Sequence, residues 1–378
     1  MRVVCAFDSF KGGMSAPEAC AAAARGVERL EPRPSVIHCP MADGGEGFAE
    51  ALSIAGCGHT ETVRVTGPLF TPVDAALVWL DGGKTAIVES AQACGLCLIP
   101  RDRRNPGAAS TRGVGELLRR ADQAGVERII VGLGGSGTND GGIGLLSAWG
   151  WRFLDGNGHE LPPVGDSLSA IRTIVPGDRP VAPVFAACDV KNPLHGPSGA
   201  AHVYARQKGA SDADIERLDA GLANYGRIAS SLLGNDVTQC PGAGAAGGLG
   251  FALLAFFKAT FRPGAEVVID VSGLRRHLDG ADLCLTGEGR TDAQTLNGKL
   301  PAAVMEACRD KGVPCVCLSG CLGTGWRDLY STGCAGVAAI CQKTQTLEEA
   351  IAESPECMAD AAEMALRLFA AGMAHGRR

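Results

Sequence analysis

The stretch RVVCAFDSF, residues 2–10, is the starting point for the fold prediction because an apolar strand pattern ends there in a polar loop. A helical pattern follows at 16–30, opened by SAPE at 15–18, which is a capping box with proline in the first turn. A strand at 35–40 and a helix at 46–56 continue the alternation. Alternating strands and helices are typical of a parallel sheet with helices on both faces.

The alternation stops in the middle of the chain and returns in its last third. Three successive strands are predicted at 61–65, 73–80 and 84–90, and the DGGK between the last two favours a hairpin. In chain order we then expect a helix at 111–124, a strand ending at 131, strands near 151–154 and 181–188, a helix at 212–233, a strand at 282–286, a helix at 300–311, strands at 314–319 and 335–340, and a helix at 356–373.

These patterns predict an α/β protein of two α/β domains. A flavodoxin-like parallel-sheet domain would be built from both chain ends, residues 1–60 plus 265–378. An α/β domain with a mixed sheet would be inserted between them, at 61–264. An insertion of this kind leaves a cleft between domains, which is a common place for a ligand site.

Composition excludes several functional classes for the 378 residues. A formal net charge of −6 without a basic block argues against nucleic-acid and membrane-surface partners. No signal-peptide pattern is found, and FALLAFF at 251–257 is too short to span a bilayer. The 16 cysteines lie mostly in apolar patterns, as Cys5, Cys284, Cys315 and Cys317 do, which indicates buried free thiols and a cytoplasmic protein.

The glycine-rich segment RIIVGLGGSGTNDGG, residues 128–142, raises the question of whether it binds the phosphate of a dinucleotide or that of a nucleoside triphosphate. GLGGSG at 132–137 follows a strand, and Asp155 lies about twenty residues on, as in a dinucleotide-binding fingerprint. The fingerprint needs a helix to begin at its third glycine, but TNDGG follows instead. A P-loop is absent, because Lys299 is followed by Leu300 and lacks the required earlier glycine.

Several polar motifs lie where predicted strands end. In the flavodoxin-like domain they are DSFKGGMSA (8–16), MADGGEG (41–47) and TGEGRTDAQTLNGK (286–299). The carboxyl ends of parallel strands share one edge, so these loops would cluster where such folds bind ligands. The inserted domain contributes RNP (104–106), GGSGTND (134–140), ACDVKNP (187–193) and PGAGAAGG (241–248).

The motifs supply the side chains that phosphoryl transfer requires: carboxylates for Mg²⁺ or for a hydroxyl proton, and cations for phosphate. The carboxylates are Asp8, Asp43, Glu46, Asp140, Asp189, Glu288 and Asp292, and the cations are Lys11, Lys191, Lys299 and Arg290. An aspartate in a glycine-rich turn is more often a turn former, and a lysine is often merely solvated. Asp189 has the strongest case, since it follows an apolar strand beside Lys191.

Taken together with QKGA (207–210), these motifs resemble the glycerate kinase family that makes 2-phosphoglycerate, in the family's order from residue 8 to about 340. The resemblance implies two α/β domains, one of them flavodoxin-like, with ATP as donor, Mg²⁺ as cofactor and D-glycerate as acceptor. The chain departs from the family pattern at Gly137, at Gly13–Met14 and at Phe48, which replaces a common threonine. None of these changes removes a charged residue.

The resemblance and the loop clustering together give a specific hypothesis, a glycerate 2-kinase acting in the interdomain cleft. Asp189 is the expected base, Lys11, Lys299 and Arg290 would offset phosphoryl charge, and Asp43, Glu46, Glu288 and Asp292 would hold Mg²⁺. Substrate and phosphate contacts are expected from Asp8, Ser9, Asn105, Gly134, Gly135, Ser136, Asn139, Asp140, Lys191, Gly242, Gly244 and Gly247.

Two other classes of function stay open at the level of sequence. An NAD-dependent oxidoreductase would use the 132–137 loop and Asp155, and a non-catalytic binding protein would use the same cleft. The density of ionisable groups favours catalysis over simple binding. The expected partners are ATP and D-glycerate, and the sequence leaves a homodimer open.

Overall fold

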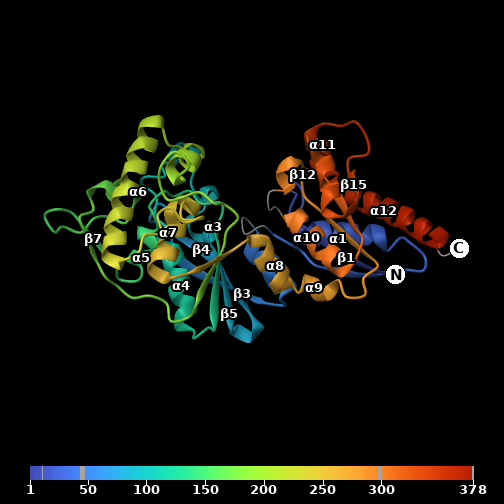
Figure 1. The fold of residues 1–378 in the computed structure, drawn as a ribbon, viewed down its shortest axis with the longest axis horizontal. Coiled ribbons are helices and arrows are strands. Elements are labelled where there is room, and N and C mark those ends of the chain that lie inside the picture. Colours follow the sequence, from blue (N-terminus) through green and yellow to red (C-terminus); the bar gives the residue numbers. More distant parts are fainter. Residues whose placement is uncertain (11, 43–46, 297–299, 377–378) are drawn as a thin grey trace. The chain divides into compact units, whose positions relative to one another are not determined.

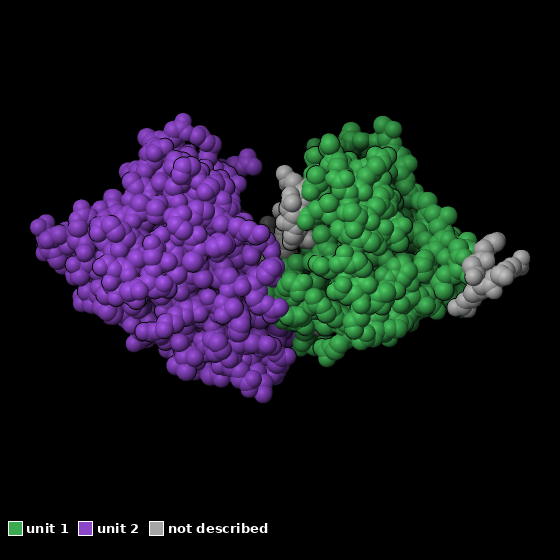
Figure 2. All heavy atoms as spheres, viewed as in Figure 1, with its two compact units in different colours: residues 1–43, 50–57, 265–378 green, residues 44–49, 58–264 purple. Residues whose placement is uncertain are grey.

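The structure is a computed structural model that describes residues 1–10, 12–42, 47–296 and 300–376. The chain forms two compact units, which Figure 2 colours separately. Unit 1 comprises 1–43, 50–57 and 265–378, and unit 2 comprises 44–49 and 58–264. Each unit has its own sheet and helices, so the predicted class of two α/β domains is confirmed.

Unit 1 contains a five-stranded sheet in the order β15-β13-β11-β1-β2. Its strands, all paired in parallel, are β1 (Arg2–Phe7), β2 (Ser35–His38), β11 (Leu283–Gly287), β13 (Cys315–Ser319) and β15 (Cys334–Ala339). Numbered within the unit this is the order 2-1-3-4-5 of flavodoxin-like folds, as predicted. The order reverses between β1 and β11, which is where such folds bind ligands.

Helices cover both faces of this sheet, and alternate strand residues point to opposite faces. Leu283 and Leu285 of β11 pack in one core with α1 (Ala16–Val27) and α12 (Ser354–Gly376), whereas Cys284 between them approaches α10 (Leu300–Lys311). Helices α1 and α12 lie so close that a Cβ at Gly26 would be 1.8 Å from the Ala359 carbonyl oxygen. The remaining elements complete the unit (Figure 1): α1 (Ala16–Val27), α2 (Phe48–Ala55), α8 (Gly264–Ser272), α9 (Leu274–His277), α10 (Leu300–Lys311), α11 (Leu347–Ala352), α12 (Ser354–Gly376), β12 (Arg290–Thr291) and β14 (Cys321–Leu322).

Unit 2 contains a six-stranded mixed sheet in the order β10-β9-β6-β5-β4-β3. Its strands are β3 (His59–Thr66), β4 (Pro72–Leu80), β5 (Thr85–Glu89), β6 (Arg128–Gly132), β9 (Val184–Ala187) and β10 (Thr260–Arg262). The first three pair antiparallel, with a turn at Asp81–Gly83 that confirms the predicted hairpin, and the other pairs are parallel. A separate antiparallel pair joins β7 (Arg152–Leu154) to β8 (Thr173–Val175).

The helices of unit 2 are α3 (Ser90–Cys94), α4 (Arg112–Gln123), α5 (Ile143–Ser147), α6 (Asp212–Leu233) and α7 (Ala245–Phe257). The predicted range of α6 is confirmed in full. Helix α7 contains FALLAFF, and most of its side chains are buried, so it shows no amphipathic period by which it could be predicted. None of the described helices has the length and apolarity that crossing a membrane requires.

Candidate active site

A pocket of about 440 Å³ opens in unit 2 where β6 ends in the glycine-rich loop. We call it the Lys208 pocket. Its lining includes Gly134, Gly135 and Ser136 from the loop, with Arg104 and Lys208 from segments distant in sequence. Three of the predicted ligand residues therefore lie together, beside two cations that the prediction did not assign to the site.

Lys208 is the most unusual side chain of the pocket, because it is a lysine with only 3% of its surface exposed. Its ammonium group donates hydrogen bonds to Ser136 Oγ at 3.0 Å and to the Thr138 carbonyl oxygen at 2.8 Å. Burial lowers the pKa of Lys208 to about 8, although electrostatic interactions with Cys94 and Asp140 act to raise it. Buried lysines are rare unless they are paired or functional, which makes Lys208 a candidate for binding an anion.

Local backbone shape fixes Lys208 at this place. The lysine ends a turn at Arg206–Lys208 that follows an irregular helical segment at Ala201–Ala205. Gly209 has a φ of +101°, and a Cβ there would be 2.5 Å from the Arg104 carbonyl oxygen. The glycine of QKGA thus allows the RNP segment to approach the lysine. Lysines are scarce in this arginine-rich sequence, and the place of Lys208 next to a glycine was the available signal.

Asp140 holds the glycine-rich loop from inside the unit. Its carboxylate is fully buried and accepts hydrogen bonds from the Thr111 amide and hydroxyl, both at 2.8 Å, and from the amides of Gly142 and Gly144. Burial raises its pKa, although these hydrogen bonds act in the opposite direction. The geometry makes Asp140 a positioning residue for the loop.

Asn139 is also fully buried, and its side-chain oxygen and nitrogen have no hydrogen-bond partner among the described residues. The Nε atom of Arg104 is in the same condition. Buried polar groups are normally satisfied, so these atoms are candidates for a ligand or an ordered water. Of the two residues, Arg104 lines the Lys208 pocket. Asn105, by contrast, is exposed and its Oδ1 accepts the Gly107 amide at 3.0 Å, which forms a local turn.

The second glycine-rich loop, PGAGAAGG, packs directly against the first. Gly247 has a φ of +70°, and a Cβ there would be 2.1 Å from the Thr138 carbonyl oxygen. The Gly247 carbonyl accepts the Gly141 amide at 3.0 Å. Gly244 approaches the Pro193 carbonyl and Gly242 the Phe261 ring in the same manner. These three glycines, predicted as ligand residues, are therefore also required by packing.

Gly247→Ala is expected to lower the free energy of unfolding by about 2–4 kcal/mol, since it adds a backbone clash to left-handed strain. Chemical denaturation of the purified chain would measure the change. Gly125→Ala is the matched control, because Gly125 has a φ of +76° and a Cβ added there would have nothing within 4 Å. Equal losses for the two variants would contradict the close approach of the two loops.

Asp189 and Lys191 lie in the loop after β9, and both are exposed. Asp189 Oδ1 accepts the Gly264 amide at 2.9 Å, which orients the carboxylate. Val190, the next residue, lines the Lys208 pocket. The sequence-predicted base therefore lies on a loop that borders the pocket.

Those of the other predicted residues that the structure describes, Asp8, Ser9, Glu288, Arg290 and Asp292, follow strands β1 and β11 at the carboxyl edge of the unit 1 sheet. Asp8 follows β1 and its Oδ1 accepts the Ser9 amide at 2.6 Å. Glu288 follows β11, is 8% exposed and accepts the Thr295 hydroxyl at 2.6 Å. Arg290 pairs with Asp292 at 3.2 Å. Lys11, Asp43, Glu46 and Lys299 lie outside the described residues.

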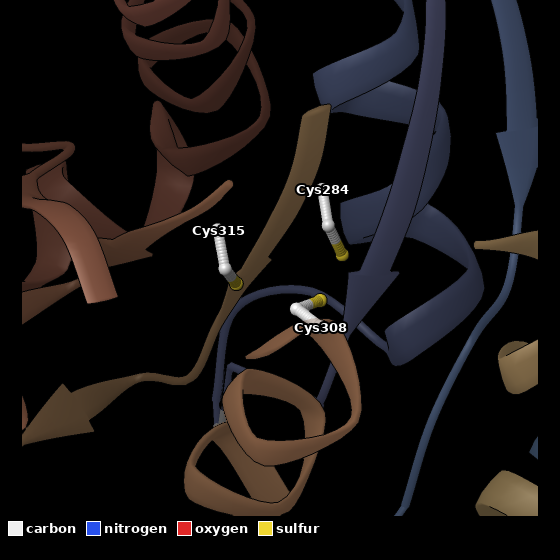
Figure 3. Close-up of side chains that lie close together, drawn as sticks. All are labelled: Cys284, Cys308 and Cys315. Atoms are coloured by element: carbon white, nitrogen blue, oxygen red, sulfur yellow. The ribbon is translucent and has the colours of Figure 1, made fainter. Parts of the chain in front are cut away.

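The tightest group of metal-ligating side chains in the described parts of the chain consists of thiols. Figure 3 shows Cys284 of β11, Cys308 of α10 and Cys315 of β13 with their sulfurs turned toward one another, and all three Sγ atoms lie within 4.8 Å. The β11–β13 register pairs Cys284 with Cys315. A structural zinc site takes four ligands and Mg²⁺ prefers oxygen, so the trio fits core packing.

The structure contradicts the dinucleotide hypothesis. No helix begins at Gly137; α5 begins only at Ile143, after Gly141 and Gly142 at positive φ. Asp155 follows β7, which lies outside the main sheet, and its Oδ1 accepts the amides of Asn157 and His159. Asp155 is therefore a turn former, and the helix dipole that the fingerprint needs is missing.

Phe48, the residue at which the chain departs from the family pattern, is fully buried.

Comparison with known proteins identifies the family. Residues 3–370 match the profile of the glycerate kinase family. The chain is 41% identical to a glycerate kinase of Bacillus cereus over 354 residues, which cover 93% of each chain. It is 39% identical to the glycerate 2-kinase of Escherichia coli K12, again over 93% of each chain.

A solved structure gives the same result in three dimensions. The crystal structure described as glycerate kinase 2 from Salmonella typhimurium LT2 superposes with a TM-score of 0.87, at 38% sequence identity, and the match covers 99% of each chain. Identity at this level over nearly the whole length extends the likeness beyond a shared fold. The chain therefore belongs to the glycerate kinase family.

Proposed function

We propose that this chain transfers the γ-phosphoryl group of ATP to the 2-hydroxyl of D-glycerate, giving ADP and 2-phospho-D-glycerate. Membership of the glycerate kinase family supports the reaction class. The observation that supports glycerate as the phosphoryl acceptor is the Lys208 pocket, where a buried ammonium group contacts a glycine-rich loop. A small hydroxy acid with one carboxylate suits that charge.

Lys208 and Arg104 are the proposed partners of the glycerate carboxylate. A charge-assisted hydrogen bond of this kind is worth about 1.5–3 kcal/mol. The unpaired amide of Asn139 lies in the loop that also contributes Ser136, and it is a proposed partner for glycerate directly or through water. Gly134 and Gly135 line the same wall and leave room for a ligand close to the backbone.

Asp189 is the proposed base. Phosphoryl transfer requires little covalent chemistry from the protein, and a carboxylate that accepts the hydroxyl proton assists attack on phosphorus. The hydrogen bond from the Gly264 amide fixes one carboxylate oxygen. Lys191, two residues on, lies on the same exposed loop and is proposed to stabilise the anionic substrate.

The edge of the unit 1 sheet is proposed to hold Mg²⁺. Mg²⁺ usually takes one or two carboxylates, several waters and substrate phosphates, so Glu288 and Asp292 fit as a partial set. When bound, the ion neutralises charge on the phosphates of ATP. Arg290, Asp8 and Ser9 are proposed to contact phosphate or its ion there, and the roles of Lys11, Lys299, Asp43 and Glu46 remain sequence-based proposals. Homodimer formation and a cytoplasmic location also stay predictions.

The test is ADP release from MgATP and D-glycerate with enolase present and phosphoglycerate mutase absent. Immediate enolase turnover is expected, because enolase consumes 2-phosphoglycerate directly. Turnover that begins only after the mutase is added would move the reaction to the 3-hydroxyl. No ADP release from glycerate or related hydroxy acids would instead favour the non-catalytic binding role.

A further inference from the structure

A second pocket, of about 460 Å³, lies entirely within unit 1. We call it the edge pocket. Its lining includes Phe10, Gly289, Gly320 and Ile340, which follow β1, β11, β13 and β15 respectively. These four strands are parallel, so the pocket lies at their common carboxyl edge and includes the switch point between β1 and β11.

The chemistry of the edge pocket differs from that of the Lys208 pocket. The residues that line it include no lysine, arginine, histidine, aspartate or glutamate within the described chain. Phe10, Ile340, Leu347 and Ile351 provide apolar walls. An anion of the size of glycerate would find no compensating charge among these described lining residues, whereas a neutral, flat and largely apolar group would be well accommodated.

Gln345 provides one specific polar group. Its Nε2 donates to Cys341 Sγ at 3.3 Å, while its Oε1 is buried with no partner among the described residues. A buried acceptor of this kind needs a donor. The exocyclic amine of adenine is such a donor, on a ring that the apolar walls can hold.

We infer that the edge pocket binds the adenine base of ATP. The inference deepens the proposed function, on which it rests, by assigning the nucleoside end of the donor to unit 1. The loops after β1 and β11 that supply Phe10 and Gly289 also contain Asp8 and Glu288. Adenine bound in the edge pocket would therefore lie at the same sheet edge as the residues proposed to bind phosphate and Mg²⁺.

The test compares two tryptophan substitutions on one short helix. Ala350 lines the pocket, whereas Ala352, also in α11, is exposed and does not. Ala350→Trp is expected to weaken ADP binding at least tenfold in a calorimetric titration of the full chain without glycerate, and Ala352→Trp less than twofold. In turnover, Ala350→Trp should raise the KM for ATP and leave the KM for glycerate unchanged.

A folded Ala350→Trp variant that binds ADP as tightly as the unmodified chain would overturn the inference. The titration needs no turnover, so the two proposals fail separately. If Ala350→Trp abolishes ADP binding but the unmodified chain does not phosphorylate glycerate, the proposed function is wrong and the adenine assignment stands. If Ala350→Trp turns over glycerate normally and binds ADP unchanged, the adenine assignment is wrong and the proposed function stands.

A second measurement uses the unmodified chain, in case tryptophan at 350 prevents folding. Cys341 is exposed and lines the pocket, whereas Cys57 is exposed in unit 1 and does not line it. ADP is expected to slow alkylation of Cys341 by N-ethylmaleimide at least fivefold and to leave Cys57 unaffected, as read by peptide mass. Equal rates at Cys341 with and without ADP would contradict the assignment.

Discussion

Asp189→Asn is expected to lower kcat for glycerate phosphorylation about 1,000-fold, within the range of roughly 10²–10⁴ that a positioned general base contributes. The amide oxygen of asparagine can still accept the Gly264 N–H, so the loop should keep its shape. The KM values for ATP and glycerate should therefore change little. Steady-state kinetics with the enolase-coupled assay would separate the two parameters.

Asp74→Asn is the control for this result. Asp74 is an exposed carboxylate of β4 in the same unit, with Arg64 at 3.5 Å, and such surface pairs contribute little. Its variant should retain normal kcat. If Asp189→Asn also keeps normal turnover, Asp189 is not the base, and another carboxylate or the phosphate itself must accept the proton.

Lys208→Met is expected to lower kcat/KM for glycerate about 100-fold, which corresponds to loss of a charge-assisted hydrogen bond of about 3 kcal/mol. Methionine keeps most of the apolar stem and removes the buried charge. The KM for ATP should stay within about twofold if Lys208 contacts only the acceptor. Lys84→Met, an exposed lysine of unit 2 paired with Glu127, should change neither value.

The low pKa of Lys208 gives this prediction a pH signature. Below about pH 8 the ammonium is charged in the folded and the unfolded chain, and the cost of burying it is present in full. Between about pH 8 and 10.5 the folded chain binds fewer protons than the unfolded chain, so the free energy of unfolding should rise with pH relative to Lys208→Met.

Glycerate affinity should move in the opposite direction, because the neutral amine no longer attracts the carboxylate. The KM for glycerate is therefore expected to rise above about pH 8 in the unmodified chain and to show no such rise in Lys208→Met. A KM profile that is the same in both chains would contradict an acceptor role for Lys208, whatever the size of the effect at neutral pH.

Local patterns predicted most of the fold because they report short-range physics. The capping box at Ser15 forms, with Glu18 accepting the Ser15 amide at 2.8 Å, and the DGGK turn joins β4 to β5. Strands β10 and β8 were missed, because a strand of three residues carries little periodic signal.

The candidate site was predictable in part. Ser136 and the glycines of its loop do line a pocket, because a loop that ends a parallel strand lies at the ligand edge. Lys208 was noted as one of few lysines, beside a glycine and within QKGA, but it received no role, since its burial depends on contacts with residues about seventy positions away. Asp155 shows the opposite error, because its spacing matched a fingerprint that its strand pairing excludes.

The sequence by itself determined the α/β class, the flavodoxin-like order and the family. The alternation of strands and helices, the turn residues and the eight ordered motifs are all local patterns of the sequence. Only the tertiary structure decided which motif residues hold the loops and which line a pocket. Asp140 turned inward to satisfy four donors, and Lys208 became buried beside Ser136. Burial and hydrogen-bond partners come from residues far apart in the chain, and no local pattern specifies them.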